Sequence, residues 1–331
     1  MACDSLRGMP RERSAAIDAV RVLGIIAVVA GHVWDTPLMR DLIYTWQVPF
    51  FFVLSGYLWS AGRPVVTEVR NRWRTLGVPY AFWLGTIGAL CVALQLYQGD
   101  FTWQFVVRLV AGGSYLGRPF SAFWFLSALF VACLLYRLLE RSRWAIAGVA
   151  TAGLVAAWTL PLALAAIPLG AGIAIPALSF MFAGVMLKRI RERILLPALV
   201  GACLIVIAGA IVALGWADPL DMKRGDFGTP VISVLVAVAI SFGLILVADY
   251  FTPLLGRTAS RWVVALATCG TMVILTHSAV LWLLASPPQG SFIDFTLAIA
   301  VPWVVALAIS RTPLAPLMIG APQRKVMIQP A

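Results

Sequence analysis

The feature that most constrains this chain is a repeated pattern of long apolar segments. Runs of about 17 to 25 apolar residues are separated by short basic clusters along the sequence. A helix needs about 20 apolar residues to cross the hydrocarbon core of a membrane. The strands of a transmembrane β-barrel would instead alternate in segments of about ten residues. The sequence therefore predicts an all-α, polytopic membrane protein.

The composition supports this fold class. Hydrophobic residues make up 61% of the chain and charged residues only 12%, whereas charged residues account for about a quarter of a soluble domain. The net charge of +11 does not predict nucleic-acid binding, because the basic residues lie between apolar segments and are not gathered on one soluble face. We therefore expect membrane lipid, and not nucleic acid, as a partner.

Ten transmembrane helices are predicted, in one domain over residues 17–310, with a basic tail at 1–16 and a second tail at 311–331. Basic residues concentrate in alternate loops, which marks those loops as cytoplasmic. Of the 25 Lys and Arg residues, only Arg40, Arg108, Arg118, Lys223 and Arg224 fall on the opposite side. Both termini are thus predicted to be cytoplasmic, and the location to be the inner (plasma) membrane. The predicted spans are Ile17–Thr36, Ile43–Ala61, Leu76–Tyr97, Phe123–Leu139, Trp144–Ile167, Gly170–Leu187, Ile194–Ala217, Val231–Thr252, Trp262–Ala285 and Phe292–Ile309.

Two ionisable residues stand in the first apolar segment. Ten apolar or glycine residues, VLGIIAVVAG, separate Arg21 from His32. Eleven steps of about 100° and 1.5 Å place both side chains on one helix face, about 16 Å apart along the axis. Arg21 then lies near the cytoplasmic surface and His32 near mid-membrane. Ionisable groups at that depth usually face a cavity or a partner, so both are expected to line a functional site.

The imidazole of His32 can take or give a proton near neutral pH. Asp35 follows three residues later, near the same helix face, and is predicted to orient the ring. Simpler interpretations stay open for all three residues. His32 can be satisfied by helix contacts, Asp35 can be solvated at the helix end, and Arg21 can reach headgroups or pair with Asp18.

Four further polar or aromatic residues stand inside apolar segments and are candidates for a functional site. They belong to VPFFFVLSGYL (48–58), FWFLSAL (123–129) and CGTMVILTHSAV (269–280). Plain helix packing is the alternative for each, and the Ser-Gly pair at 55–56 is also expected to let another backbone approach closely. Zinc would require more ligands than these segments gather, so no metal is predicted. The four candidates are Ser55, Tyr57, Trp124 and His277.

The densest basic cluster precedes the third span, in VRNRWRTLGVPY. Its arginines are Arg70, Arg72 and Arg74. Guanidinium groups suit phosphates because they form paired, charge-assisted hydrogen bonds. A cytoplasmic loop that only sets the topology would show the same cluster.

Five segments, taken in order, resemble the membrane-bound acyltransferase 3 family, which includes bacterial O-acetyltransferases of cell-surface polysaccharides and of macrolides. They are Asp18 through Arg21 to His32, VPFFFVLSGYL, the arginines before GVPY, FWFLSAL, and the G-x-x-x-x-x-x-H spacing from Gly270 to His277. The resemblance covers most of the chain. The family's arginine, ten residues, histidine motif falls on Arg21 and His32. Its Arg-x-x-Arg pair is imperfect here, where Arg70-x-Arg72-x-Arg74 stands instead.

The resemblance implies transfer of an acyl group, most often acetyl, from cytoplasmic acyl-CoA to a hydroxyl of a carbohydrate or glycolipid acceptor at the outer face. Arg21, Arg70, Arg72 and Arg74 would then bind the phosphates of the acyl-CoA donor. His32 would be the catalytic residue at the thioester, either as general base or as a transient acyl carrier, with Asp35 as its partner. The tunnel would be lined, or the thioester oxygen bound, by Ser55, Tyr57, Trp124 and His277. An alternative from another class is a proton-coupled transporter or flippase, because intramembrane Arg and His also mark proton pathways.

Overall fold

The fold is all-helical, as predicted. The structure is a computed structural model that describes residues 15–321. Within that range every regular element is a helix, and an isolated antiparallel bridge joins Trp34 to Gln289. Of the predicted tails at 1–16 and 311–331, residues 1–14 and 322–331 lie outside the described residues.

Each predicted span coincides largely with one longer helix, and in the described residues, 15–321, six helical stretches are long and apolar enough to cross a membrane. The chain is therefore a multi-pass membrane protein, while ten crossings and cytoplasmic termini remain predictions. The longer helices are α1 (Ala15–Val33), α3 (Gln47–Tyr57), α5 (Val78–Gln98), α7 (Phe123–Leu139), α8 (Arg143–Thr159), α10 (Ala171–Ile190), α11 (Pro197–Ala213), α12 (Ile232–Phe251), α13 (Arg257–Leu283) and α14 (Phe292–Ile309).

Shorter helical pieces connect these elements. The π-helical turn η2 joins α4 to α5 just before Pro79. Proline has no amide hydrogen for the usual bond to the preceding turn, which is a reason for the irregular turn there. The short elements are α2 (Pro37–Met39), η1 (Arg40–Tyr44), α4 (Val65–Arg72), η2 (Trp73–Gly77), α6 (Trp103–Ala111), η3 (Gly113–Tyr115), α9 (Pro161–Ala165), η4 (Pro168–Gly170), η5 (Arg191–Arg193), η6 (Met222–Arg224), η7 (Thr252–Leu254) and α15 (Ala315–Met318).

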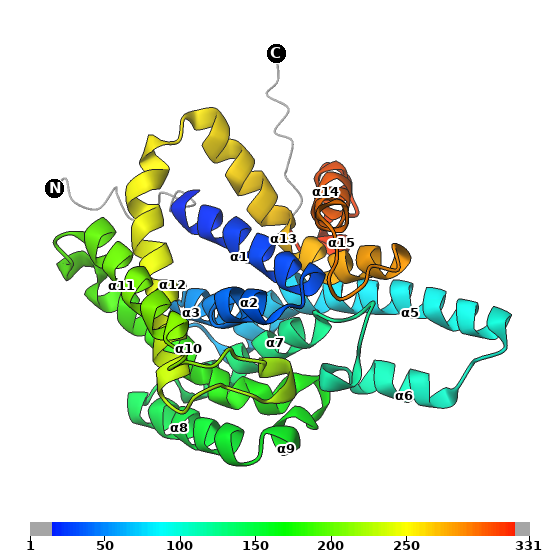
Figure 1. The fold of residues 1–331 in the computed structure, drawn as a ribbon, viewed down its shortest axis with the longest axis horizontal. Coiled ribbons are helices and arrows are strands. Elements are labelled where there is room, and N and C mark those ends of the chain that lie inside the picture. Colours follow the sequence, from blue (N-terminus) through cyan, green and yellow to red (C-terminus); the bar gives the residue numbers. More distant parts are fainter. Residues whose placement is uncertain (1–14, 322–331) are drawn as a thin grey trace.

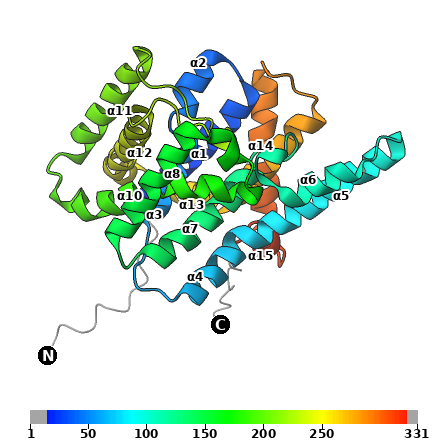
Figure 2. The ribbon, with the colours of Figure 1, turned by 90° about the horizontal axis from the view of Figure 1, so that it is seen from below.

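Two elements differ from the predicted spans. The span at 43–61 is realised as part of η1 followed by α3, which has 11 residues and rises only about 16 Å. The long loop at 99–122 contains the helix α6. In both views α6 runs beside α5, and the two extend together away from the rest of the molecule (Figures 1 and 2).

The helix α3 lies deep in the molecule because glycines let its neighbours approach. A Cβ on Gly56 would overlap the carbonyl oxygen of Met181 in α10, and a Cβ on Gly184 would overlap the carbonyl oxygen of Val53. The prediction of a close backbone approach at the 55–56 pair is thus confirmed. Helix α1 packs against α13, α12 and α3, and Figure 1 shows it between α12 and α13.

Candidate active site

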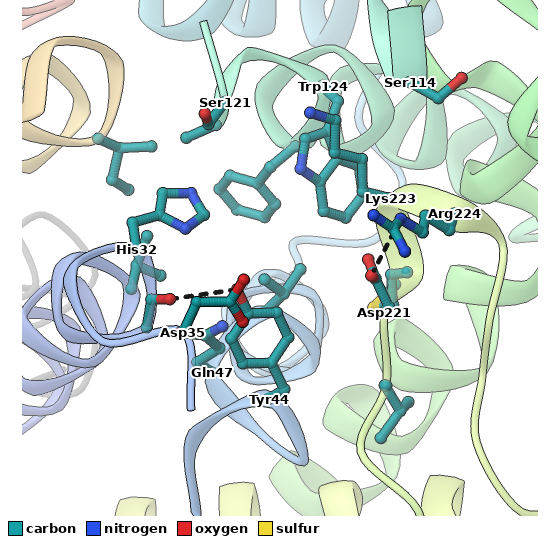
Figure 3. Close-up of a pocket in the computed structure, with 18 of the residues that line it drawn as sticks. His32, Asp35, Tyr44, Gln47, Ser114, Ser121, Trp124, Asp221, Lys223 and Arg224 are labelled. Carbon is teal, nitrogen blue, oxygen red and sulfur yellow. Dashed lines mark hydrogen bonds and ion pairs between the residues drawn. The ribbon is translucent and has the colours of Figure 1, made fainter. Parts of the chain in front are cut away.

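His32 stands one residue before the end of α1 and lines a cavity of about 460 Å³. We call this the histidine cavity. Figure 3 shows the labelled side chains around it, which come from α1 and the turn after it, η1, α3, η3, the turn before α7, α7 itself and the loop containing η6. The ring is therefore neither turned to lipid nor sealed in aliphatic packing. The lining residues used below are His32, Tyr44, Gln47, Arg118, Trp124 and Lys223.

The ring of His32 stacks on that of His277 from α13. Their centroids lie 5.1 Å apart and their planes are inclined by 25°. Nδ1 of His277 is 3.0 Å from the carbonyl oxygen of Val273, and because a carbonyl oxygen only accepts, Nδ1 carries the hydrogen. Nε2 then accepts from Ser278 Oγ at 3.2 Å. His277 is fully buried, so it supports the ring of His32 from behind the cavity wall.

Arg21 lines a second cavity, of about 380 Å³, together with Ser55 and Arg72. We call this the arginine cavity. Arg21 also pairs with Asp18 at 3.1 Å, as the simpler interpretation of the sequence proposed. Arg21 and His32 thus lie on the same continuous helix, α1, but line different cavities.

The two cavities meet at three apolar residues, Phe51, Phe125 and Ile274, which line both of them. The rings of Phe51 and Phe125 are 5.4 Å apart at their centroids. We call these three side chains the constriction. A Cβ on Gly24 would lie only 3.0 Å from Cζ of Phe51, so the glycine between Arg21 and His32 leaves space for that ring. Three apolar side chains therefore stand between a basic compartment and a compartment that holds an imidazole.

Comparison with known families decides the class of this chain. A family model described as an acyltransferase domain matches residues 14–317. The chain belongs to the acyltransferase 3 family. It is thus a membrane acyltransferase, and the resemblance inferred from the sequence is confirmed. No curated protein and no solved structure gave a match.

Asp35 does not contact His32 as the sequence predicted for this acyltransferase. The helix α1 ends at Val33, so the three-residue spacing no longer holds both side chains on one face. The carboxylate of Asp35 instead accepts a hydrogen bond from Arg40 Nε at 2.6 Å. Asp35 still lines the histidine cavity. The side chain that packs against the ring of His32 is His277.

Of the three clustered arginines, only Arg72 lines the arginine cavity, whereas Arg70 and Arg74 are exposed on the same helical segment. Arg72 Nε donates to Glu68 Oε1 at 2.7 Å, and Glu68 Oε2 accepts from Arg137 at 2.9 Å. The side chains of Glu68 and Arg137 are each only 1% exposed. This buried carboxylate fixes the orientation of Arg72 and leaves its terminal nitrogens for a ligand.

The remaining candidates divide between the cavities and the core. Trp124 lines the histidine cavity and Ser55 the arginine cavity. Tyr57 is buried in the contact between α3 and α10 and lines neither of them.

The sequence analysis missed two cations of the histidine cavity, Arg118 and Lys223. Arg118 donates to the backbone carbonyl oxygens of His32, at 2.7 Å, and of Ser286, at 2.5 Å. Lys223 Nζ donates to the carbonyl oxygen of Leu116. Burial lowers the pKa of Lys223, and it raises the pKa of the neighbouring Asp221. The sequence did contain a signal, the small set of five basic residues predicted on the outer side. In the structure four of them, all but Arg108, lie at or beside this cavity.

Proposed function

We propose that this acyltransferase moves an acyl group, acetyl in the simplest case, from cytoplasmic acyl-CoA to a hydroxyl of a carbohydrate or lipid-linked acceptor at the outer face of the inner membrane. One observation carries the proposal. The cavity lined by His32 shares three residues with the cavity lined by Arg21 and Arg72. Coenzyme A has phosphates at one end and a thioester at the end of a long thin arm, which suits a basic compartment that adjoins a compartment with an imidazole.

In this proposal the donor occupies the arginine cavity. The guanidinium groups of Arg21 and Arg72 bind phosphate oxygens through charge-assisted hydrogen bonds. The pantetheine arm passes the constriction and brings the thioester to His32. The acceptor enters the histidine cavity from the opposite side, where Arg118 and Lys223 line its wall.

The reaction is a single acyl exchange. The acceptor hydroxyl oxygen attacks the thioester carbonyl carbon, a C–O bond forms and the C–S bond breaks. His32 takes the proton from the hydroxyl and returns it to the departing thiolate, so the products are an O-acyl ester and free CoA. General-base catalysis of this kind contributes about 10²- to 10⁴-fold. In the competing route, His32 itself accepts the acyl group before the acceptor attacks.

The test uses the purified protein in lipid nanodiscs with labelled acetyl-CoA and a set of glycan acceptors. We expect transfer to fall by at least about 10²-fold in His32→Ala, while Asp41→Asn, an exposed control, keeps full activity. Transfer that persists without His32 would exclude the mechanism. Label trapped on His32 after incubation with donor alone would select the acyl-histidine route.

The same assay addresses the transporter alternative, which the family does not favour. A transporter or flippase would move its substrate without consuming acetyl-CoA. Release of CoA that depends on His32 would therefore exclude it.

A further inference from the structure

A buried glutamine lines the histidine cavity and has no catalytic role in the proposed reaction. Gln47 is the first residue of α3 and only 2% exposed. Among the described residues, its side-chain oxygen Oε1 has no hydrogen-bond partner. Buried polar atoms in folded proteins are nearly always hydrogen-bonded. An orphaned amide oxygen in a cavity wall therefore indicates that a ligand supplies the missing partner.

The amide is held directly beside the catalytic helix turn. A Cβ on Gly31 would lie 3.2 Å from Oε1 and 3.3 Å from Nε2 of Gln47, so the amide packs over the residue that precedes His32. Tyr44 donates to the carbonyl oxygen of Gly31 at 3.2 Å and closes the other side. Figure 3 shows Gln47 and Tyr44 together at one wall of the cavity that His32 also lines.

The chemistry of an amide selects its ligand. A primary amide both accepts and donates hydrogen bonds and carries no charge. A hydroxyl group has the same dual character, whereas an alkyl chain would leave the amide unpaired and an anion would satisfy only its NH₂ group. Because His32 takes the proton of the reacting hydroxyl, Gln47 is free to bind a second hydroxyl of the same acceptor.

We propose that Gln47 is an acceptor-binding residue that recognises a hydroxyl adjacent to the one that is acylated. The substrate class is thus a polyol such as a sugar ring, in preference to a simple alcohol. This inference rests on the proposed function and adds to it the feature by which the acceptor is distinguished. A site built to hydrogen-bond a hydroxyl discriminates strongly against an analogue that lacks it.

The experiment compares two acceptors that share an alkyl tail, octyl β-glucoside and 1-octanol, with acetyl-CoA as donor and the protein in nanodiscs. We expect Gln47→Leu to lower kcat/KM for octyl glucoside by about tenfold or more. We expect the rate with 1-octanol and the KM for acetyl-CoA to stay within about twofold. Gln95→Leu is the matched control, because the Gln95 amide oxygen is also buried and unpaired in the described structure but lines neither cavity.

A second variant covers the case in which Gln47→Leu does not fold. Gly31→Ala keeps the amide and displaces it, because the added methyl group would press on Gln47 and on the ring of Tyr44. It should also reduce transfer to octyl glucoside more than transfer to 1-octanol. Gln47→Glu, which keeps a hydrogen-bond acceptor, should retain part of the preference for the glucoside.

The outcomes separate this inference from the proposed function. The role of Gln47 would be overturned if Gln47→Leu lowered transfer equally with both acceptors or raised the KM for acetyl-CoA. It would also be overturned if the wild-type protein showed no preference for the glucoside. A wild-type protein that releases CoA but acetylates neither acceptor would overturn it as well, and would leave the donor half of the proposed function standing. A wild-type protein that releases no CoA would overturn the proposed function itself.

Discussion

Arg118 donates a hydrogen bond to the backbone carbonyl oxygen of His32, at 2.7 Å. Its other terminal nitrogen donates to the carbonyl oxygen of Ser286, at 2.5 Å. One guanidinium group therefore ties the loop before α7 to the end of α1 and to the connection between α13 and α14. The cation also lies at the carboxyl end of α1, where unpaired carbonyl groups carry partial negative charge.

This contact predicts that Arg118 positions the imidazole. Arg118→Met removes both hydrogen bonds, and we expect kcat for acyl transfer to fall by about 10- to 100-fold, because small displacements of a catalytic group cost about that much. Arg118→Lys can restore one bond and should recover part of the activity. The KM for acetyl-CoA should stay unchanged, since Arg118 does not line the arginine cavity. A normal kcat in Arg118→Met would contradict this role.

The constriction predicts a different kinetic effect. Phe51→Ala widens the passage between the cavities, so water reaches the thioester more easily. We expect release of CoA without acceptor to rise several-fold relative to transfer, while Phe51→Trp should slow both. Phe251→Ala, an exposed phenylalanine on α12, serves as control. An unchanged ratio of hydrolysis to transfer in Phe51→Ala would show that the constriction does not control access.

The arginine cavity predicts unequal roles for the clustered arginines. Arg72→Gln removes a guanidinium that lines the cavity, and we expect the KM for acetyl-CoA to rise by about tenfold or more, the effect of losing a charge-assisted hydrogen bond. Arg74→Gln, two residues later and exposed, should change it by less than about twofold. Equal effects of the two substitutions would show that phosphate binding is not confined to the cavity.

The buried pair of Glu68 and Arg137 predicts a large effect on stability. Glu68→Ala removes a buried carboxylate that pairs with both Arg72 and Arg137. Arg137 keeps its second partner, Glu140, at 2.6 Å, so we expect a loss of about 1 to 3 kcal/mol, the cost of leaving buried hydrogen-bonding groups unsatisfied. We expect the melting temperature in detergent to fall below that of Glu192→Ala, an exposed control. Adding Arg137→Met to Glu68→Ala should cost less than the sum of the two single losses, because both substitutions remove the same pair. A melting temperature like that of the control would contradict the assignment.

The sequence predicted those parts of the site that lie on one continuous helix. The spacing of Arg21 and His32 needs only the geometry of α1, and the structure keeps that helix intact from Ala15 to Val33. Asp35 was predicted wrongly as a contact of His32, because the end of a helix depends on its neighbours, here the bridge of Trp34 to Gln289. Sequence spacing cannot indicate where such tertiary contacts stop a helix.

Residues that reach the site from distant segments were the ones missed. Arg118 lies 86 positions from His32, and the basic pattern only marked it as an outer-loop cation. Gln47 was hidden at the start of an apolar segment, where one amide has no periodic signal. Glu68 could have been found from its four-residue spacing to Arg72, but its second partner, Arg137, is 69 residues away.

Asp221 provides a pH test at the mouth of the histidine cavity. Burial raises the pKa of this carboxyl above its usual 3.8, although Arg224, Arg40 and Lys223 oppose the shift. Because the pKa is raised in the folded state, the ionised carboxylate lowers the free energy of unfolding at neutral pH. This loss of stability disappears as the pH falls through the raised pKa toward 3.8, since the carboxyl then becomes protonated in the folded state. Asp221→Asn should therefore raise the melting temperature at pH 7, because it removes the buried charge. The substitution also removes the ion pair with Arg224, but Arg224 is largely exposed and this pair contributes only about 0 to 1 kcal/mol. The difference from wild type should shrink as the pH falls to about 4. A difference that grows toward acid pH would show that ionised Asp221 stabilises the fold instead.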